Sequence, residues 1–202
     1  MPDPLVVAHR GACARFPEHT WPAYRAAIDE GADVVEVDVV VTRDGVLVAR
    51  HDQALSRTTD AASRPGLAHA REVRPHEAGP ADDIWADLLT WDELRVLRCR
   101  ERWPDVRRTS AAHDGQWPVL RLRDVLALVE EQSRLRDRVI GVAIEVKTGD
   151  VGGALDPAVM ADRVLDDLEA ASVPSDAVPA WLLAFDPVVL DRARDRQTGR
   201  PG

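Results

Sequence analysis

The chain contains few of the residues that mark several broad classes of protein. Its 202 residues include only two cysteines, Cys13 and Cys99, which lie far apart and lack CxxC spacing. This pattern excludes a disulfide framework and a cysteine-ligated zinc site, and it agrees with free thiols in a reducing compartment. We therefore expect a cytoplasmic location.

Long apolar runs and basic blocks are also missing. No window approaches the length of a membrane span, and the N-terminal MPDPLVVAHR has no basic region followed by a long apolar stretch. We expect neither stable membrane insertion nor a signal peptide. The formal net charge of -9 argues against a general nucleic-acid or anionic-membrane binder. A small anionic substrate is compatible with this charge if a local positive site receives it.

Lysine is nearly absent. Lys147, in the segment IEVK, is the only lysine among 26 basic residues. An ammonium is a compact point charge, whereas a guanidinium is a planar fork. Lys147 is therefore either required for the shape of its side chain or retained by chance at a surface position, and the sequence leaves both interpretations open.

The length and the 45% hydrophobic content predict one domain, residues 1–202, with a sizeable core. Short apolar segments alternate with segments of helical periodicity, and an irregular insertion is expected around residues 61–116. This alternation predicts an α/β protein with a parallel sheet and about five βα units. The expected strands are 5–8, 34–41, 118–120, 139–147 and 180–185, and the expected helices are 21–32, 90–97, 122–131, 156–171 and 187–194.

The stretch from Val34 to Asp52 reads VVEVDVVVTRDGVLVARHD. Strand alternation places Glu36 and Asp38 on one face, about 7 Å apart. Because two ionised carboxylates among apolar neighbours repel each other and lose hydration, we expect a cation nearby. The Asp-Gly pair in TRDG predicts a type I′ turn, which would place Asp38 opposite His51. Together these side chains suggest a metal and proton-transfer site.

Polar residues lie where several apolar strands are expected to end. These residues are His9, Glu36, Asp38 and Glu145, and TIM-type barrels place their active sites at the carboxyl ends of their strands. Three carboxylates without clustered cysteines favour Mg²⁺ or Ca²⁺ over zinc. The alternative interpretation is that the acids are solvated edge charges or arginine partners and that the histidines are structural.

The motifs HRG, PE-x-T, GAD-x-x-E-x-D, T-x-DG, HD and L-x-RTT, between His9 and Thr59, resemble the N-terminal signature of the glycerophosphodiester phosphodiesterase family. The resemblance continues through TWDELRVL, IEVK and LLAFDP. It implies a TIM-barrel enzyme that hydrolyses small-molecule glycerophosphodiesters to glycerol 3-phosphate and an alcohol.

The same resemblance implies a role for each of eight side chains. His9 and His51 would be the acid–base pair, Glu36, Asp38 and Glu145 the ligands of a divalent metal, Arg10 and Lys147 the cations that contact phosphate, and Glu18 a supporting group. The sequence departs from the family pattern at His19, where the family usually has Asn.

The last three βα units of the family have no counterpart in this sequence. The resemblance therefore predicts a TIM-barrel-type phosphodiesterase fold truncated to about five of eight βα units, with open sheet edges that would allow self-association. Two alternatives are a catalytically weak or inactive partial barrel and a related phospholipase-type phosphodiesterase.

Overall fold

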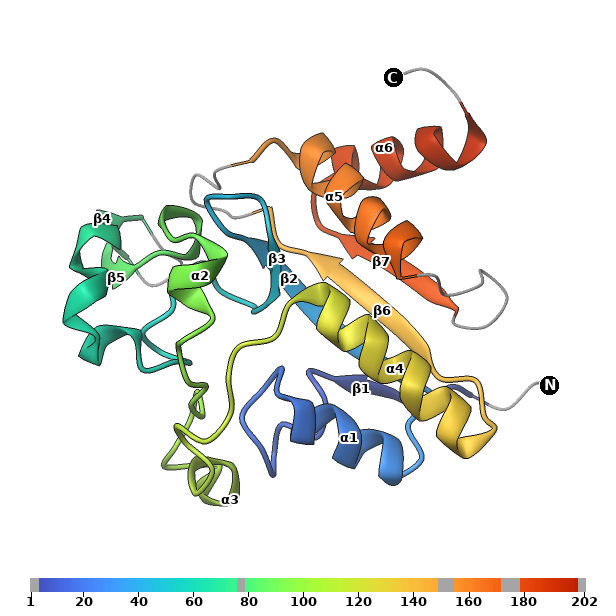
Figure 1. Cartoon of the computed structure of the whole chain (residues 1–202), viewed down its shortest axis with the longest axis horizontal. Helices are drawn as coiled ribbons and strands as arrows, with labels where there is room; N and C mark the ends of the chain where they lie inside the picture. The colour runs from blue at the N-terminus through green and yellow to red at the C-terminus, as the bar shows by residue number, and fades with distance from the viewer. Residues whose placement is uncertain (1–3, 76–78, 149–154, 172–178, 200–202) are drawn as a thin grey trace.

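A parallel sheet forms the centre of the computed structural model, which describes residues 4–75, 79–148, 155–171 and 179–199. The four parallel strands lie in the order β1-β2-β6-β7, and the short strand β3 pairs antiparallel with β2 (Figure 1). Helices follow or precede the strands along the chain, and α4 packs against both α1 and α5. This alternation confirms the predicted α/β class. The elements are β1 (Val7–His9), α1 (Trp21–Asp29), β2 (Val34–Val41), β3 (Leu47–Ala49), α4 (Leu122–Arg136), β6 (Gly141–Val146), α5 (Pro157–Ala170), β7 (Ala180–Ala184) and α6 (Pro187–Thr198).

The two faces of the sheet have different chemistry because side chains alternate along each strand. On one face, the valines at positions 35, 37, 39 and 41 of β2 pack with helical residues in the main hydrophobic core, as do the apolar side chains at positions 142, 144 and 146 of β6. The intervening positions of the same strands include Glu36, Asp38 and Glu145. The face away from the main core therefore carries the carboxylates.

Helices α5 and α6 each begin with a proline behind an aspartate that caps the helix. Asp156 and Asp186 each precede a helix that begins with proline, and their side chains accept hydrogen bonds from Ala158 N (2.8 Å) and Val188 N (2.9 Å). The last helix is expected over 187–194, but α6 continues to Thr198, and residues 200–202 lie outside the described part of the chain.

The hairpin between β2 and β3 is correctly predicted to exist, but its predicted register is wrong by one residue. Val40 pairs with Val48, so residue numbers across the hairpin sum to 88 and not 89. The loop has three residues, 43–45, and only Gly45 has a positive φ, +80°, whereas a type I′ turn needs two such residues. Thr42 Oγ1 fixes this wider loop by contacting Asp44 Oδ1 at 2.6 Å and accepting from Val46 N at 2.9 Å. His51 is therefore not the partner of Asp38.

The parallel sheet has four strands among the described residues, one fewer than expected. Residues 118–120 form no strand; Pro118 makes an isolated bridge to Arg98, and the following Arg121 makes one to Val48. A proline lacks the N–H group that a continuous ladder requires, which explains why this segment does not enter the sheet.

The region predicted as an irregular insertion has a small core of its own. Its side chains at Leu67, Ile84, Leu94 and Leu97 pack with residues of β2 and β3 in a second hydrophobic cluster. Figure 1 shows the β4, β5 and α2 elements of this region beside the main sheet. The helix expected over 90–97 starts as predicted, with Trp91 behind a Thr90 capping box, but it ends at Leu94 and is shorter than expected. The elements here are η1 (Ala61–Ser63), η2 (Pro65–Ala70), β4 (Arg71–Arg74), β5 (Ala81–Ile84), η3 (Ala86–Leu88), α2 (Trp91–Leu94) and α3 (Arg108–Ala111).

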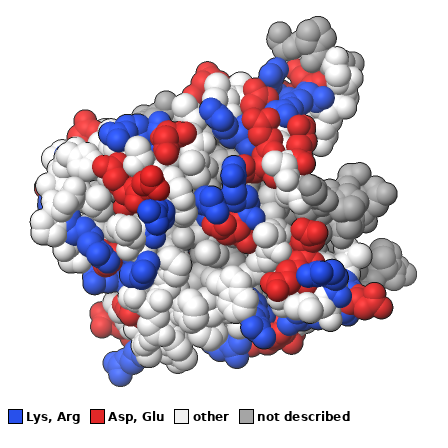
Figure 2. Space-filling model, in the orientation of Figure 1, with Lys and Arg blue, Asp and Glu red and all other residues white. Residues whose placement is uncertain are grey.

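The outer strands β1 and β7 each have a neighbour on one side only, within the ranges that the structure describes. Apolar side chains are exposed along both: Val7 is 52% exposed, Trp181 43% and Leu183 42%. On the face drawn in Figure 2, acidic and basic side chains are interspersed. Each helix in the described ranges is too short or too polar to serve as a transmembrane span.

Candidate active site

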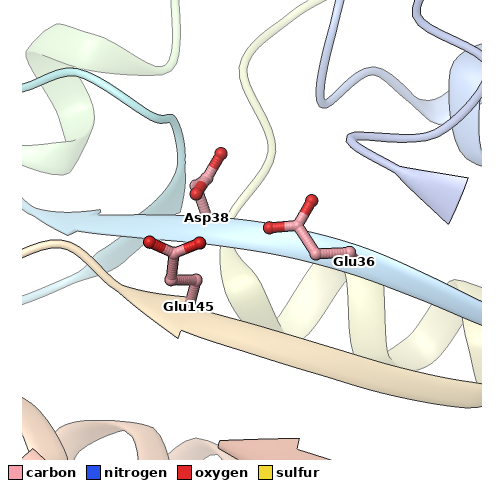
Figure 3. A group of neighbouring side chains, drawn as sticks. All are labelled: Glu36, Asp38 and Glu145. Carbon is pink, nitrogen blue, oxygen red and sulfur yellow. The ribbon is translucent and has the colours of Figure 1, made fainter. Parts of the chain in front are cut away.

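Three carboxylates converge on the polar face of the sheet (Figure 3). Glu36 and Asp38 come from β2, and Glu145 comes from β6, where it lies level with Asp38 in the parallel register. One oxygen of each group lies within 4.8 Å of the others. Oxygens on opposite sides of an ion at about 2.3 to 2.6 Å would be about 5 Å apart, so this spacing suits a single hard cation.

Glu36 provides an independent test of whether a cation fits. Its Oε2 accepts a hydrogen bond from Arg10 N at 2.8 Å, while its buried Oε1 receives none from the residues that the structure describes. Burial and the neighbouring charge of Asp38 raise the pKa of Glu36 to about 7. A cation would supply the missing partner of Oε1 and offset the repulsion between the two acids.

Three side chains with N–H groups contact the carboxylate of Asp38. Its Oδ2 lies 3.0 Å from Arg10 Nε and 3.0 Å from His19 Nε2, and its Oδ1 lies 3.0 Å from Lys147 Nζ. Burial opposes the charge on Asp38, but these partners outweigh that penalty and lower its pKa. Lys147 also contacts Glu145, so the lone lysine belongs to this cluster and not to the open surface.

His19 joins the cluster to helix α1. The ring is fully buried, with Nε2 facing Asp38 and Nδ1 lying 2.8 Å from the Tyr24 hydroxyl. Burial lowers the pKa of His19, and because a carboxylate only accepts, the neutral ring donates from Nε2 and accepts from Tyr24 at Nδ1. Sequence reasoning assigned His19 no such role; its place in the family motif, where Asn is usual, was the only signal.

The two candidate catalytic histidines come from different parts of the sheet. His9 is the last residue of β1 and lies level with Glu36 in the parallel register. Its pKa is lowered by partial burial and by the adjacent Arg10 charge. His51 follows β3, and its Nδ1 lies 2.5 Å from Asp52 Oδ1.

A chain of charged contacts links His51 to the carboxylates. Arg102 reaches Asp52 Oδ2 at 2.5 Å, and it donates to both oxygens of Glu18, at 2.7 Å and 3.0 Å. Glu18 in turn contacts Arg10 at 3.4 Å. The predicted supporting residue Glu18 thus lies within the site. The sequence did not identify Arg102 as a site residue, because it lies in a polar segment without periodicity, 84 residues along the chain from Glu18.

Arg50 fixes the loops around this chain of contacts. The side chain is almost fully buried and donates to three backbone carbonyls, those of Ala49 (2.7 Å), Thr58 (3.0 Å) and Glu18 (2.7 Å). Because three chain segments share one guanidinium, the loop that carries Glu18 is held in place from the hairpin side.

The raised pKa of Glu36 has a measurable effect on the stability of the metal-free protein. Its ordinary pKa is 4.5 and its folded pKa is about 7, so the unfolded state loses the proton first as pH rises and stability falls across this interval. We expect Glu36→Gln to raise the free energy of unfolding by about 2 to 3 kcal/mol at pH 8 in the presence of a chelator, and by little at pH 4.5. Urea titrations at both pH values measure this.

Glu130→Gln on α4 is the control for that measurement, because it also removes one carboxylate charge, but at a solvent-exposed position. Equal stability of the wild type and Glu36→Gln at pH 8 would contradict the electrostatic strain inferred for Glu36.

Carboxylates, histidines and cations at the ends of parallel strands are the active-site layout of TIM-barrel-type enzymes. Comparison with known proteins narrows this class. The chain belongs to the glycerophosphoryl diester phosphodiesterase family, whose family model matches residues 9–198.

Individual relatives agree with this assignment. Glycerophosphodiester phosphodiesterase GDPD6 of Arabidopsis thaliana is 31% identical over 144 residues, which cover 71% of this chain and 37% of that protein. A crystal structure from Silicibacter pomeroyi DSS-3 has a TM-score of 0.72 and 25% identity, covering 98% of this chain and 62% of that chain. An Oleispira antarctica phosphodiesterase in complex with sn-glycerol-3-phosphate has a TM-score of 0.63 and 22% identity, covering 95% of this chain and 61% of that chain. This chain therefore spans less than two thirds of each of these relatives.

Proposed function

We propose that this protein hydrolyses glycerophosphodiesters to glycerol 3-phosphate and an alcohol, with a divalent cation bound at its carboxylate cluster. The observation that carries this proposal is the convergence of Glu36, Asp38 and Glu145 beside Arg10 and Lys147. The family match, which includes all five residues, supports it, and the related Oleispira protein was solved with sn-glycerol-3-phosphate.

The cation is proposed to be Mg²⁺ or Ca²⁺, because all the candidate ligands are carboxylate oxygens. When bound, such an ion polarises phosphoryl oxygens and favours deprotonation of the attacking group. Arg10 and Lys147 would bind the phosphate oxygens with their remaining N–H donors. Glu18 orients Arg10 for this task through its contact at 3.4 Å.

His9 and His51 are proposed to move the protons of the reaction. In hydrolysis a water oxygen bonds to phosphorus while the bond from phosphorus to the alcohol oxygen breaks. One imidazole takes the proton from the attacking group, and the other gives a proton to the departing alcohol oxygen. The contact between His51 Nδ1 and Asp52 leaves Nε2 of that ring for proton transfer.

Release of glycerol 3-phosphate from glycerophosphocholine tests this function. We expect release that a chelator abolishes and that added Mg²⁺ or Ca²⁺ restores. Cleavage of phosphatidylinositol, but not of glycerophosphocholine, would favour the phospholipase-type alternative. Folded protein that binds the cation without turning over either substrate would favour the inactive partial barrel.

Self-association through the open sheet edges is a further part of the proposal. The exposed apolar residues of β1 and β7 support it, since unpaired strands with apolar side chains promote edge-to-edge association. We expect the isolated 202-residue chain to be poorly active and either oligomeric in size-exclusion chromatography or only partly ordered in amide hydrogen exchange. A monomer with strongly protected amides in both strands and robust turnover would contradict this.

Because Cys13 and Cys99 are unpaired, we also propose a cytoplasmic location.

A further inference from the structure

Arg102 occupies a position between the two halves of the proposed site. Its side chain is only 9% exposed, and its three nitrogens reach two different carboxylates, Asp52 and Glu18. We propose that Arg102 is a positioning residue, which fixes the His51 imidazole through Asp52 and fixes Arg10 through Glu18. This inference rests on the proposed function for its effect on turnover, but the geometry it predicts can be tested without turnover.

The first step of the argument is the link from Arg102 to His51. Each oxygen of Asp52 has its own partner: Oδ2 faces Arg102, and Oδ1 faces His51 Nδ1. Because an ionised carboxylate only accepts hydrogen bonds, Nδ1 carries a proton and Nε2 is the nitrogen left for proton transfer. Asp52 can turn neither oxygen away while both contacts hold, so the ring is held in one tautomer and one orientation.

The second step is the charge of Asp52. Burial opposes ionisation of this group, but the His51 hydrogen bond and the Arg102 charge outweigh it and lower its pKa to about 2. His51 and Arg102 are the charged or titratable groups that face it among the described residues. Without Arg102, Asp52 would be easier to protonate, and a protonated Asp52 could no longer select the His51 tautomer.

The third step is the link from Arg102 to the phosphate-binding side. Two parallel contacts hold Glu18, at 2.7 Å and 3.0 Å, in the bidentate geometry that only a guanidinium provides. Glu18 then contacts Arg10, which contacts Asp38. Arg102 therefore contacts both the carboxylate that holds His51 and the carboxylate that holds Arg10.

The segment that carries Arg102 is itself fastened at several points. Arg100 N donates to Thr58 O at 2.8 Å, and the same carbonyl accepts from Arg50, the residue before His51. The neighbouring Glu101 is 3% exposed and accepts from Trp103 N at 2.8 Å and from the Ser110 hydroxyl at 2.5 Å. The backbone that carries Arg102 is therefore held by hydrogen bonds on both sides, as a positioning group requires.

Kinetics of Arg102→Met and Arg102→Lys test this inference. We expect Arg102→Met to lower kcat by about 10- to 100-fold, the usual range for a group that orients an active residue. The acid limb of its pH profile should move to higher pH, because Asp52 loses a counter-charge. The kcat of Arg102→Lys should fall between those of Arg102→Met and the wild type, because an ammonium keeps the charge but cannot hold Glu18 bidentately while it contacts Asp52.

Arg74 provides a matched control. This arginine also bridges two carboxylates, Glu72 at 2.9 Å and Asp87 at 2.8 Å, and is 15% exposed, but it lies on β4. Arg74→Met should keep kcat within about twofold of the wild type and leave the pH profile unchanged. The combined loss in Asp52→Asn with Arg102→Met should be smaller than the product of the two single losses, because both residues act on His51 in series, and the loss beyond that of Asp52→Asn should come from the contact of Arg102 with Glu18. Wild-type kcat and pH profile in Arg102→Met, or equal losses in Arg74→Met, would overturn the inference.

Nuclear magnetic resonance of ¹⁵N-labelled histidine makes the test independent of turnover. We expect the His51 ring, assigned by its loss in His51→Gln, to be protonated at Nδ1 in the wild type and in Arg74→Met. Arg102→Met should instead give a mixture of tautomers. If the wild type releases no glycerol 3-phosphate but shows this pattern, the proposed function fails and the positioning inference stands. The same fixed tautomer in Arg102→Met would overturn the inference whether or not the protein is active.

Discussion

We expect His51→Ala to lower kcat with glycerophosphocholine by at least about 100-fold, at the lower end for a positioned acid or base. The imidazole is held at Nδ1 by Asp52, so its loss removes a proton-transfer group whose geometry is already fixed. KM should change little, because the proposed phosphate contacts come from Arg10 and Lys147. Steady-state kinetics at several pH values measure both parameters.

His69→Ala is the control for this variant, because His69 lies on η2 and contacts Glu93, outside the charged chain described above. It should have the kcat of the wild type. Turnover of His51→Ala close to that of the wild type would remove His51 from the catalytic pair.

The second large effect concerns the cation. We expect Glu145→Gln to weaken divalent metal binding by more than about 100-fold, since even groups that merely support metal ligands contribute 10- to 100-fold. Turnover should fall in parallel and recover in part at high metal concentration. Glu145 is suited to this test because Lys147 is its ion-pair partner among the described residues. Asp38 is less suited, because it contacts Arg10, His19 and Lys147 and its loss would disturb all three side chains.

Calorimetric titration with Mg²⁺ and Ca²⁺ measures the loss, and Glu130→Gln on α4 is the charge-matched control. If Glu145→Gln bound the cation as tightly as the wild type, Glu145 would not be a ligand, and the site would have to be sought around Glu36 and Asp38 alone.

Local patterns predicted the carboxylate strand well. Eight consecutive apolar or acidic residues from Val34 to Val41 form one strand, as expected, because side-chain alternation depends on the backbone alone. The meeting of Glu36, Asp38 and Glu145 could also be anticipated, since parallel strands bring their carboxyl ends to one edge of a sheet.

The hairpin register could not be predicted from its Asp-Gly pair. The outcome depended on whether Thr42 would bond across the turn, and a one-residue difference in loop length moved His51 away from Asp38. His51 instead reaches the site through Asp52 and Arg102. Sequence periodicity cannot predict such a chain of contacts, because Arg102 lies 50 residues from Asp52 and 84 residues from Glu18, and all three residues lie outside regular elements.

Crystals grown with Mn²⁺, in which anomalous scattering locates the ion, test the central claim most directly. We predict one ion bound by oxygens of Glu36, Asp38 and Glu145 at about 2.0 to 2.6 Å, with Arg10 and Lys147 beside it. An ion bound elsewhere, or a Glu145 side chain directed away from Glu36 and Asp38 in the metal-bound crystal, would contradict the account of this site.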